Sequence, residues 1–438
     1  MSLKIYLETL GCPKNQVDAE KLLGHLLGSG VRVVGRPEQA DVLIVNTCAF
    51  IEPAREESIE TILEMAALKS GGTRRLFVTG CLPQRFREGL RESLPEVDAF
   101  FSDLDPVRVA DQVREILGLS AGCPERRKRY LLNSPHFAYL KLAEGCDNRC
   151  AYCSIPLIKG SYRSRSRDEI VQEARELAAR GVRELNLVAQ DTTYYGRDRE
   201  ERGALASLLE ELAGIEGIEW IRLLYTHPAH LDEDVVAQIA RLPKLCRYVD
   251  LPVQHASDRI LQRMGRRTDQ RRLRELVERL RGEVEGIVLR TTVLVGFPGE
   301  TEEDFEQLLE FLTWARFERV GVFGYSREPG TRAARMRDQI PPEVVAMRVD
   351  TVSDLAQTLA QEWYESQVGR RLKVLIDDFD RETGEWVGRT EWDAPEIDGV
   401  VRVTGQARRG AFVECEIRDA APFELMGVVT ERYSVGAK

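Results

Sequence analysis

The sequence predicts an α/β fold in three parts: an N-terminal open parallel sheet, a central incomplete (β/α) barrel and a small C-terminal antiparallel β-barrel. Up to about Leu119, short apolar strands alternate with helical stretches. From Phe137 onward, six strand-like runs alternate with helices. After Gly369 the pattern changes to short β-rich pieces separated by glycines and acidic turns. We place the three domains at residues 1–122, 132–362 and 365–432.

Hydrophobic spacing defines the elements of the first domain. Short apolar runs predict strands, and apolar residues at helical spacing predict the helices between them. The predicted strands are Ile5–Leu7, Val31–Val34, Val42–Val45 and Leu76–Val78, and the predicted helices are Val17–Leu27, Ile59–Leu68 and Val107–Leu117. This alternation predicts a parallel sheet with helices on both faces.

A cysteine follows three of these strands. Cys12, Cys48 and Cys81 each come shortly after a predicted strand. Because ligands gather at the carboxyl ends of parallel strands, cysteines far apart in sequence would meet at one rim. A single cysteine at a strand end is commonly a small buried hydrophobe. Three in equivalent positions favour an iron–sulfur cluster held by three thiolates.

The central domain follows a polar, basic connector at residues 120–135. Six βα units predict a barrel open on one side, with its active site at the carboxyl ends of the strands. Its strands begin near Phe137, Glu184, Trp220, Tyr248, Ile287 and Arg319, and its helices lie near Asp168–Arg180, Gly203–Ala213, Asp232–Arg241, Asp269–Gly282 and Glu302–Arg316.

The first barrel strand is followed by a CxxxCxxC triplet, Cys146, Cys150 and Cys153. Three thiolates on one loop can hold three corners of a four-iron, four-sulfur cube that usually takes four cysteines. S-adenosylmethionine can chelate the open iron, and reduction of its sulfonium yields a 5′-deoxyadenosyl radical. The spacing, with Tyr152 before the last cysteine, resembles the radical S-adenosylmethionine superfamily signature. Zinc is the alternative, but zinc sites usually pair cysteines as two CxxC knuckles.

Two other segments lie at predicted strand ends of the barrel. Gly296 to Thr301 (Gly-Phe-Pro-Gly-Glu-Thr) combines glycines that permit close approach to a ligand, or simply form a turn, with a threonine suited to cap a helix. Gln190 and Asp191 suit a cofactor or substrate contact, with helix capping as the alternative for Asp191. The candidate cofactor contacts are Tyr152, Gln190, Asp191, Gly296 and Phe297.

Several further residues have a structural interpretation beside a functional one. Arginines alternate in Ser-Tyr-Arg-Ser-Arg-Ser-Arg, where they hold an anionic group or form an exposed strand. The two histidines of His-Pro-Ala-His suit hydrogen-bonded structural roles better than a metal site. Three cysteines have no telling spacing and are interpreted as structural. In order, these residues are Arg163, Arg165, Arg167, His227, His230, Cys123, Cys246 and Cys415.

Composition limits the function classes. The 438 residues are 43% hydrophobic, with no apolar run near the ~18 residues of a membrane span. The N-terminal residues lack the pattern of a signal peptide. Nine cysteines without such a signal indicate metal or redox chemistry in a reducing cytoplasm. The net charge of -10 disfavours a general nucleic-acid binder.

The C-terminal domain follows a predicted helix from Pro341 to about Gln367. From Glu365 to Lys438 the sequence has 15 acidic and 11 basic residues, a net charge of −4. Opposite charges steer association, so an acidic barrel suits a basic protein better than RNA. Its predicted strands are Lys373–Ile376, Trp386–Val387, Val400–Val403 and Phe412–Ile417.

Together these features resemble the methylthiotransferase family over essentially the whole chain. Gly11 to Asn15 (Gly-Cys-Pro-Lys-Asn) and Ala189 to Gly196 are similar to its RimO branch, whereas the MiaB branch typically differs after its first cysteine. Lys159 stands where the family usually has arginine; Gln16, Ala19 and Pro329 also depart from its motifs. The matching motifs are Thr9–Asn15, Asn46–Cys48, Gly80–Cys81, Glu144–Cys153 and Ile155–Gly160.

The resemblance implies two 4Fe-4S clusters, a C-terminal OB-like TRAM domain and two S-adenosylmethionine molecules per turnover. One molecule methylates a sulfur at the auxiliary cluster and leaves S-adenosylhomocysteine. The other is cleaved reductively, and its radical abstracts hydrogen from an aspartate β-carbon, which then takes the methylthio group. By this resemblance the auxiliary cluster is held by Cys12, Cys48 and Cys81, and the radical cluster by Cys146, Cys150 and Cys153.

The same resemblance implies the partners. The substrate is an aspartate of small-subunit ribosomal protein twelve, converted to 3-methylthioaspartate in the cytoplasm. The electron donor is a flavodoxin or ferredoxin. The alternatives are a MiaB-like enzyme that modifies adenosine in transfer RNA and, in another class, a non-enzymatic iron–sulfur carrier.

Overall fold

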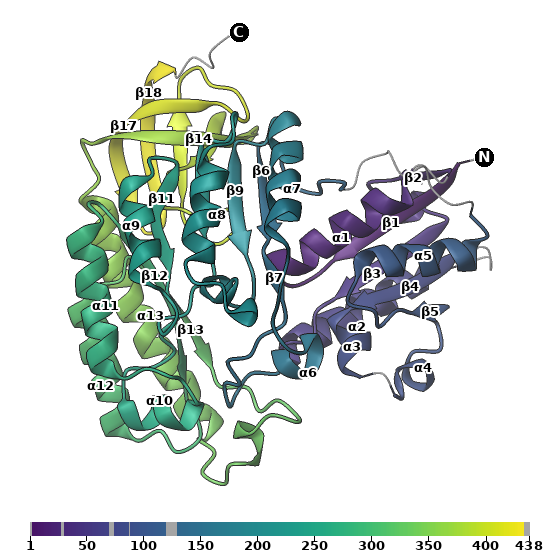
Figure 1. Ribbon diagram of the computed structural model, residues 1–438, viewed down its shortest axis with the longest axis horizontal. Coiled ribbons are helices and arrows are strands. Elements are labelled where there is room, and N and C mark those ends of the chain that lie inside the picture. The colour runs from purple at the N-terminus through teal and green to yellow at the C-terminus, as the bar shows by residue number, and fades with distance from the viewer. Residues whose placement is uncertain (1, 28–29, 70–73, 87, 120–128, 433–438) are drawn as a thin grey trace. The chain divides into compact units, whose positions relative to one another are not determined.

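The computed structural model describes residues 2–27, 30–69, 74–86, 88–119 and 129–432 (Figure 1). They form two compact units. Unit 1 comprises Met1–Asn133, Glu144–Arg163 and Ser326–Ala334, and unit 2 comprises Ser134–Ala143, Ser164–Tyr325 and Arg335–Lys438. Segment 144–163, which carries the CxxxCxxC triplet, thus belongs to the N-terminal unit. Within the described ranges, no helix has the length and apolar character needed to cross a membrane.

Unit 1 is built on a parallel sheet with strand order β2-β1-β3-β4-β5. The four strands and three helices that the sequence predicts are present, whereas β5, α3, α4 and α6 are too short for hydrophobic spacing to detect. The elements are β1 Leu3–Thr9, α1 Pro13–Leu26, β2 Val31–Val33, η1 Pro37–Gln39, β3 Val42–Thr47, α2 Glu52–Ala67, β4 Arg75–Gly80, α3 Cys81–Arg85, α4 Leu90–Ser93, β5 Ala99–Phe100, α5 Pro106–Leu117 and α6 Ile155–Lys159.

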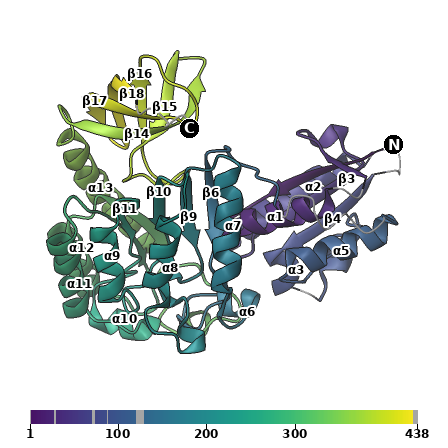
Figure 2. The same ribbon diagram turned by 45° about the horizontal axis from the view of Figure 1, so that its top comes forward.

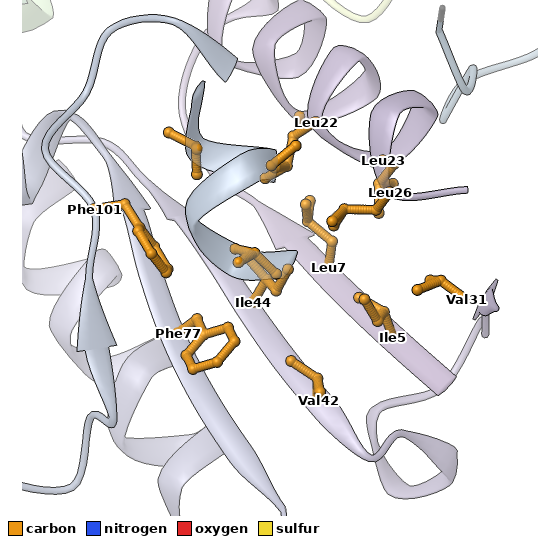
Figure 3. Packing of buried hydrophobic residues seen from close by; sticks show 14 residues of the cluster. Ile5, Leu7, Leu22, Leu23, Leu26, Val31, Val42, Ile44, Phe77 and Phe101 are labelled. Carbon is orange, nitrogen blue, oxygen red and sulfur yellow. The ribbon is translucent and has the colours of Figure 1, made fainter. Parts of the chain in front are cut away.

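Both faces of this sheet are packed. On one face, side chains of β1, β3 and β4 meet those of α1 and α5; Figure 3 shows Phe77 and Phe101 near Ile44, and Leu22 and Leu23 above Leu7. On the other face, α2 contributes Ile62 and Met65 to a second cluster. Burial on both faces is typical of a parallel α/β sheet and fixes the strand ends in place.

Unit 2 contains an open six-stranded parallel sheet with strand order β13-β12-β11-β10-β9-β6. It matches the predicted open array of six βα units, and helices α7, α8, α9, α11 and α12 lie along it (Figure 1). The short α10 was not predicted. The elements are β6 Phe137–Lys141, α7 Arg167–Ala179, β9 Glu184–Val188, η2 Thr192–Tyr194, η3 Arg197–Arg199, α8 Ala204–Ala213, β10 Trp220–Leu223, α9 Glu233–Arg241, β11 Leu245–Asp250, α10 Asp258–Met264, α11 Gln270–Glu283, β12 Val288–Val295, α12 Glu302–Ala315, β13 Arg319–Gly324 and α13 Pro342–Glu365. Three short elements lie where the chain passes from one unit to the other: η4 Ala333–Arg335, and the strands β7 Ala143–Glu144 and β8 Arg163–Ser164, which pair as a small two-stranded sheet.

The chain ends in a closed five-stranded barrel with order β14-β15-β16-β18-β17. The predicted barrel is present, but it is mixed rather than wholly antiparallel, because β16 pairs with β18 in parallel. The last strand, β18, closes the barrel and was not predicted from the sequence. The strands are β14 Arg371–Asp380, β15 Glu385–Arg389, β16 Val400–Thr404, β17 Phe412–Ala421 and β18 Glu424–Arg432.

Residues 389–398 of this barrel contact all six strands of the parallel sheet in unit 2. Figure 2 shows the barrel beside the ends of β6, β9 and β10. Each strand contributes one polar side chain to the contact, and all of these are buried except the half-buried Arg290. On β11 and β12, for example, the Tyr248 hydroxyl donates to Asp398 over 2.7 Å and Arg290 lies 3.4 Å from the same carboxylate. The contributing side chains, from β6 to β13, are Tyr139, Glu184, Arg222, Tyr248, Arg290 and Arg319.

Several acidic residues of the barrel pair with residues of the parallel sheet and therefore do not add to the charge that the barrel exposes to solvent. Asp377 pairs with His136, Asp393 with Arg319, and Asp398 with Arg290. Glu391 accepts a hydrogen bond from the Arg247 amide of β11, and Arg389 pairs with Glu184 of β9. Setting these barrel residues aside leaves 11 acidic and 10 basic residues. The net charge of −4 therefore does not describe the surface that faces solvent.

Candidate functional site

The three N-terminal cysteines lie at the carboxyl ends of neighbouring strands. Cys12 follows β1 and immediately precedes α1, Cys48 follows β3, and Cys81 follows β4 as the first residue of α3. Burial raises the pKa of the Cys81 thiol to about 12; Lys159 opposes this rise, and negative charge at Cys12 and Cys48 adds to it. The three cysteines thus follow strands that are neighbours in the sheet, β1, β3 and β4.

Two buried asparagines tie these cysteine loops together. The Asn15 side chain donates to the carbonyls of Leu10 (3.1 Å) and Thr47 (2.9 Å). The Asn46 side chain in turn donates to the Asn15 carbonyl over 2.8 Å. The Cys81 thiol lies 3.6 Å from the Asn15 side-chain oxygen. Satisfied buried amides of this kind rigidify a site, so the loops hold their shape through side chains of the protein itself.

Two glycines permit the close approach of these loops. Gly11 has φ +88°, and a Cβ there would lie 2.7 Å from the Cys48 Cβ and 2.9 Å from its sulfur. Gly80 has φ +90°, and its Cβ would lie 2.5 Å from the Thr47 carbonyl oxygen. Any side chain at either position would push a cysteine loop out of place, in addition to the strain of a positive φ.

The CxxxCxxC triplet occupies a short loop closed by backbone hydrogen bonds. The Cys146 amide donates to the Gly160 carbonyl over 3.1 Å, and the Cys153 amide donates to the Cys150 carbonyl over 3.2 Å. Gly145, at φ +77°, lies so close to Ser161 that a Cβ would be 2.1 Å from its carbonyl oxygen. The three cysteines are partly exposed, as thiols that bind an external group must be.

Asp191, which follows β9, does not cap the helix after it. Its carboxylate accepts from the Thr193 hydroxyl and pairs with His230 Nδ1, both over 2.7 Å. Burial alone would raise the pKa of Asp191, but the bond to His230 and the proximity of His227 lower it to about 2. The buried Asp191 carboxylate is therefore ionised, and it holds Thr193 and His230 by hydrogen bonds.

His227 and His230 lie beside Asp191. One imidazole nitrogen of each histidine and a carboxylate oxygen of Asp191 all lie within 4.8 Å of one another. No pattern in the sequence indicates that Asp191 lies beside these two histidines. The imidazole rings stack with centroids 4.7 Å apart. His227 Nδ1 accepts from the Ala229 amide over 3.2 Å, and burial lowers the pKa of His227 well below its usual value. These hydrogen bonds are typical of structural histidines, while the spacing of the three side chains is also that of a metal-binding group, so the structural role stays a prediction.

The other candidate cofactor contacts lie at separate places. Gln190 and Tyr152 are half-buried. Gly296, at φ +75°, leaves room for Val345, whose side chain a Cβ would meet at 2.4 Å. Phe297 is fully buried and packs edge-on against Tyr325. The missing side chain of Gly296 thus allows the close packing of Val345. The predicted helix cap is present, because Thr301 forms a capping box with Asp304 at the start of α12.

A buried group around His255 was not found from the sequence. His255 is fully buried, and its Nε2 lies 3.7 Å from Glu300. Glu300 also accepts from Arg348 over 2.7 Å, yet burial keeps the pKa of Glu300 raised. Glu300 did appear in the Gly296–Thr301 motif, but no spacing rule connects it with a histidine 45 residues earlier.

The remaining candidates have structural surroundings. Arg163 and Arg167 are exposed, and Arg167 pairs with Glu211 over 2.7 Å. Arg165 is half-buried; it pairs with Glu173 and donates to the Lys141 carbonyl, both over 2.7 Å. Cys246 and Cys415 are buried in β11 and β17. Cys123 lies outside the described residues.

Three family models match consecutive parts of the chain. Residues 4–102 match the Uncharacterized protein family UPF0004, residues 140–312 the Radical SAM superfamily, and residues 368–430 the TRAM domain. The chain accordingly uses an iron–sulfur cluster and S-adenosylmethionine.

Solved structures share the fold. The radical S-adenosylmethionine methyltransferase TsrM from Kitasatospora setae is similar at a TM-score of 0.56 and 15% identity, over 82% of this chain and 89% of that chain. The cobalamin-dependent S-adenosylmethionine radical enzyme OxsB is similar at a TM-score of 0.51 and 13% identity, over 80% of this chain and 56% of that chain.

Relatives of much higher identity cover nearly the whole chain. The ribosomal protein uS12 methylthiotransferase RimO of Heliobacterium modesticaldum is 44% identical over 98% of this chain and 95% of the relative. The protein of the same name from Anaeromyxobacter sp. is 47% identical over 98% of this chain and 93% of the relative. The chain therefore belongs to the RimO family of radical S-adenosylmethionine methylthiotransferases.

Proposed function

We propose that this chain inserts a methylthio group at the β-carbon of an aspartate in ribosomal protein uS12. The observation that carries the proposal is the placement of the six motif cysteines as two trios in one compact unit. Abstraction of a hydrogen atom and delivery of sulfur must occur at the same carbon, so two cysteine sites in one unit suit this reaction. The names of the relatives support uS12 as the substrate.

We further propose that each trio holds a 4Fe-4S cluster. Thiolate is the ligand that such clusters take from proteins. The N-terminal trio fits because its three thiols follow the neighbouring strands β1, β3 and β4, and because Gly11 and Gly80 let the cysteine loops approach one another closely. The triplet loop fits because its three thiols are partly exposed on a short loop closed by backbone hydrogen bonds.

When bound, the two clusters and two molecules of S-adenosylmethionine supply the radical, the methyl group and the sulfur. The chain's own residues hold and orient these groups. We propose that five residues contact S-adenosylmethionine: Tyr152, Gln190, Asp191, Gly296 and Phe297. Of these, Gln190 and Asp191 follow β9 at the carboxyl edge of the sheet, where ligands of such folds gather. The electron donor is proposed to be a flavodoxin or ferredoxin.

Mass spectrometry of the product tests the substrate and the reaction together. Reconstituted enzyme, reductant and S-adenosylmethionine are incubated with uS12, which should gain the mass of one sulfur plus CH₂ on an aspartate. An adduct on transfer RNA instead of uS12 would favour the MiaB-like alternative. A non-enzymatic iron–sulfur carrier would form no 5′-deoxyadenosine, which chromatography of the same mixture detects.

Cysteine variants separate the two sites. Cys150→Ala should abolish formation of 5′-deoxyadenosine but keep the iron of the N-terminal site. Cys48→Ala should keep some cleavage of S-adenosylmethionine and stop methylthiolation. Cys246→Ala, in a buried cysteine of β11, is the matched control and should keep both activities. Full methylthiolation by Cys48→Ala would show that the N-terminal trio does not hold the auxiliary cluster.

A further inference from the structure

A buried lysine lies between the two cysteine sites of unit 1. Lys159 is the last residue of α6, the short helix that follows the triplet, and it is 3% exposed. Buried lysines are rare unless they are paired, because removing an ammonium from water is costly. The position of Lys159 therefore needs a physical reason.

The ammonium pairs with carboxylates from both cysteine segments. Its Nζ lies 3.6 Å from Asp18 Oδ2 and 3.5 Å from Glu144 Oε1. Asp18 lies on α1, the helix that begins directly after Cys12, and Glu144 precedes Cys146 by two residues. One cation thus links the segment that carries the triplet to the segment that carries the first N-terminal cysteine.

The same lysine is also close to Cys81. Its neighbour Ile158 belongs to the hydrophobic cluster that contains Cys81. Lys159 itself lines a small cavity together with Thr79 and Gly80, the two residues before Cys81. Lys159 thus lies next to the end of β4, after which Cys81 follows.

We propose that Lys159 is a positioning residue of the methylthiotransferase reaction, whose buried ammonium fixes the triplet segment beside the auxiliary site and offsets negative charge there. This inference rests on the proposed function, since it takes Cys12, Cys48 and Cys81 as ligands of a cluster. Lys159 touches no substrate in this role; it acts through the cysteine segments that it joins.

The role of Lys159 has an electrostatic consequence. A cluster held by three thiolates is negatively charged, and reduction adds another negative charge. Net charge and burial are among the factors that set the potential of such a cluster. Replacing the ammonium removes a positive charge that pairs with Asp18 and Glu144 close by, at a site where low polarity strengthens electrostatic interactions. The reduced form would then be less stable and the midpoint potential more negative.

The experiment uses the full chain with Cys150→Ala, which removes the radical cluster so that only the auxiliary cluster is observed. Lys159→Met and Lys159→Arg are added to this parent and reconstituted without oxygen. Potentiometric titration followed by electron paramagnetic resonance then gives the midpoint potential. We expect Lys159→Met to shift it to a more negative value and Lys159→Arg to restore the value of the parent.

A second variant keeps the test decisive if Lys159→Met binds no cluster. Asp18→Asn keeps the lysine and removes one negative charge, so it should shift the midpoint potential to a more positive value. Midpoint potentials of Lys159→Met or Asp18→Asn equal to that of the parent would overturn the inference. Absence of iron from the Cys150→Ala parent would overturn the proposed auxiliary cluster itself and this role of Lys159 with it.

Discussion

Arg389 of β15 donates a hydrogen bond over 2.8 Å to Glu184, the first residue of β9, and their side chains are 3% and 0% exposed. Glu184 also accepts from Arg222 of β10. Burial alone would raise the pKa of Glu184, but the two arginines outweigh it and lower the pKa. The C-terminal barrel is thus fixed to the parallel sheet by a buried carboxylate shared between two cations.

Removing this carboxylate should destabilise the protein strongly. Glu184→Ala would leave Arg222 and Arg389 buried without their shared partner, and breaking a buried ion pair in this way costs about 3–5 kcal/mol. Calorimetry should show a large fall in melting temperature. Glu210→Ala is the control, because its pair with Arg241 is exposed and should change stability by less than about 1 kcal/mol. Equal melting temperatures for both variants would contradict this prediction.

A methyl group at Gly11 should impair the auxiliary site specifically. Its Cβ would lie 2.7 Å from the Cys48 Cβ, so Gly11→Ala must displace a cysteine loop. In the Cys150→Ala background we expect iron to fall well below the about four atoms per chain of one cluster. The control is Gly30→Ala, with a similar φ of +79° but nothing within 4 Å. Equal iron in the two variants would show that positive φ, rather than the contact with Cys48, limits the site.

The long elements and the cysteine positions could be predicted from the sequence for a physical reason. Strands and helices with regular apolar spacing are fixed locally, and the carboxyl ends of neighbouring parallel strands meet by geometry. Cys12, Cys48 and Cys81 follow β1, β3 and β4 for this reason. The helices α3 and α6 could not be predicted, because a helix of five residues is too short to show the 3.6-residue spacing of apolar side chains.

Contacts between distant segments could not be predicted. No local pattern shows that Lys159 pairs with Asp18, or that His230 pairs with Asp191. The total charge of the C-terminal barrel was misleading for the same reason, because Asp393 and Asp398 pair with arginines of the sheet. The amino-acid composition gives the number of charged residues, but it does not show which of them are exposed to solvent and which are paired inside the protein.

His255 should make stability depend on pH. Burial lowers the pKa of His255 to about 3, whereas an unfolded histidine has a pKa of about 6.5. Between these values only the unfolded chain takes up this proton. The contribution of His255 is therefore complete above about pH 6.5 and falls by about 1.4 kcal/mol per pH unit below it.

Urea unfolding at pH 7, 6 and 5 checks this expectation against His255→Asn. Asparagine can still accept a hydrogen bond from the Ser257 amide, as His255 Nδ1 does over 3.0 Å. The variant should lose less stability between pH 6 and pH 5 than the parent. His227 is present in both proteins, so its own titration cancels in the comparison. Parallel stability curves would contradict the expectation.

The parallel sheet should not fold without the C-terminal barrel. A chain that ends after Glu365 would deprive Arg319 of Asp393, Arg290 of Asp398 and Arg222 of two backbone carbonyls, while Asp250 stays beside Arg290 and Glu184 beside Arg222. Breaking a buried ion pair costs about 3–5 kcal/mol, so the loss of Asp393 from Arg319, added to the other two losses, rivals the few kcal/mol by which proteins are stable. We expect the truncated chain to be insoluble or to lack a cooperative melting transition, and co-expression of residues 366–438 to restore solubility. A soluble truncated chain with a sharp transition would contradict this, because it would mean that the sheet tolerates these cations without the segment that pairs with them.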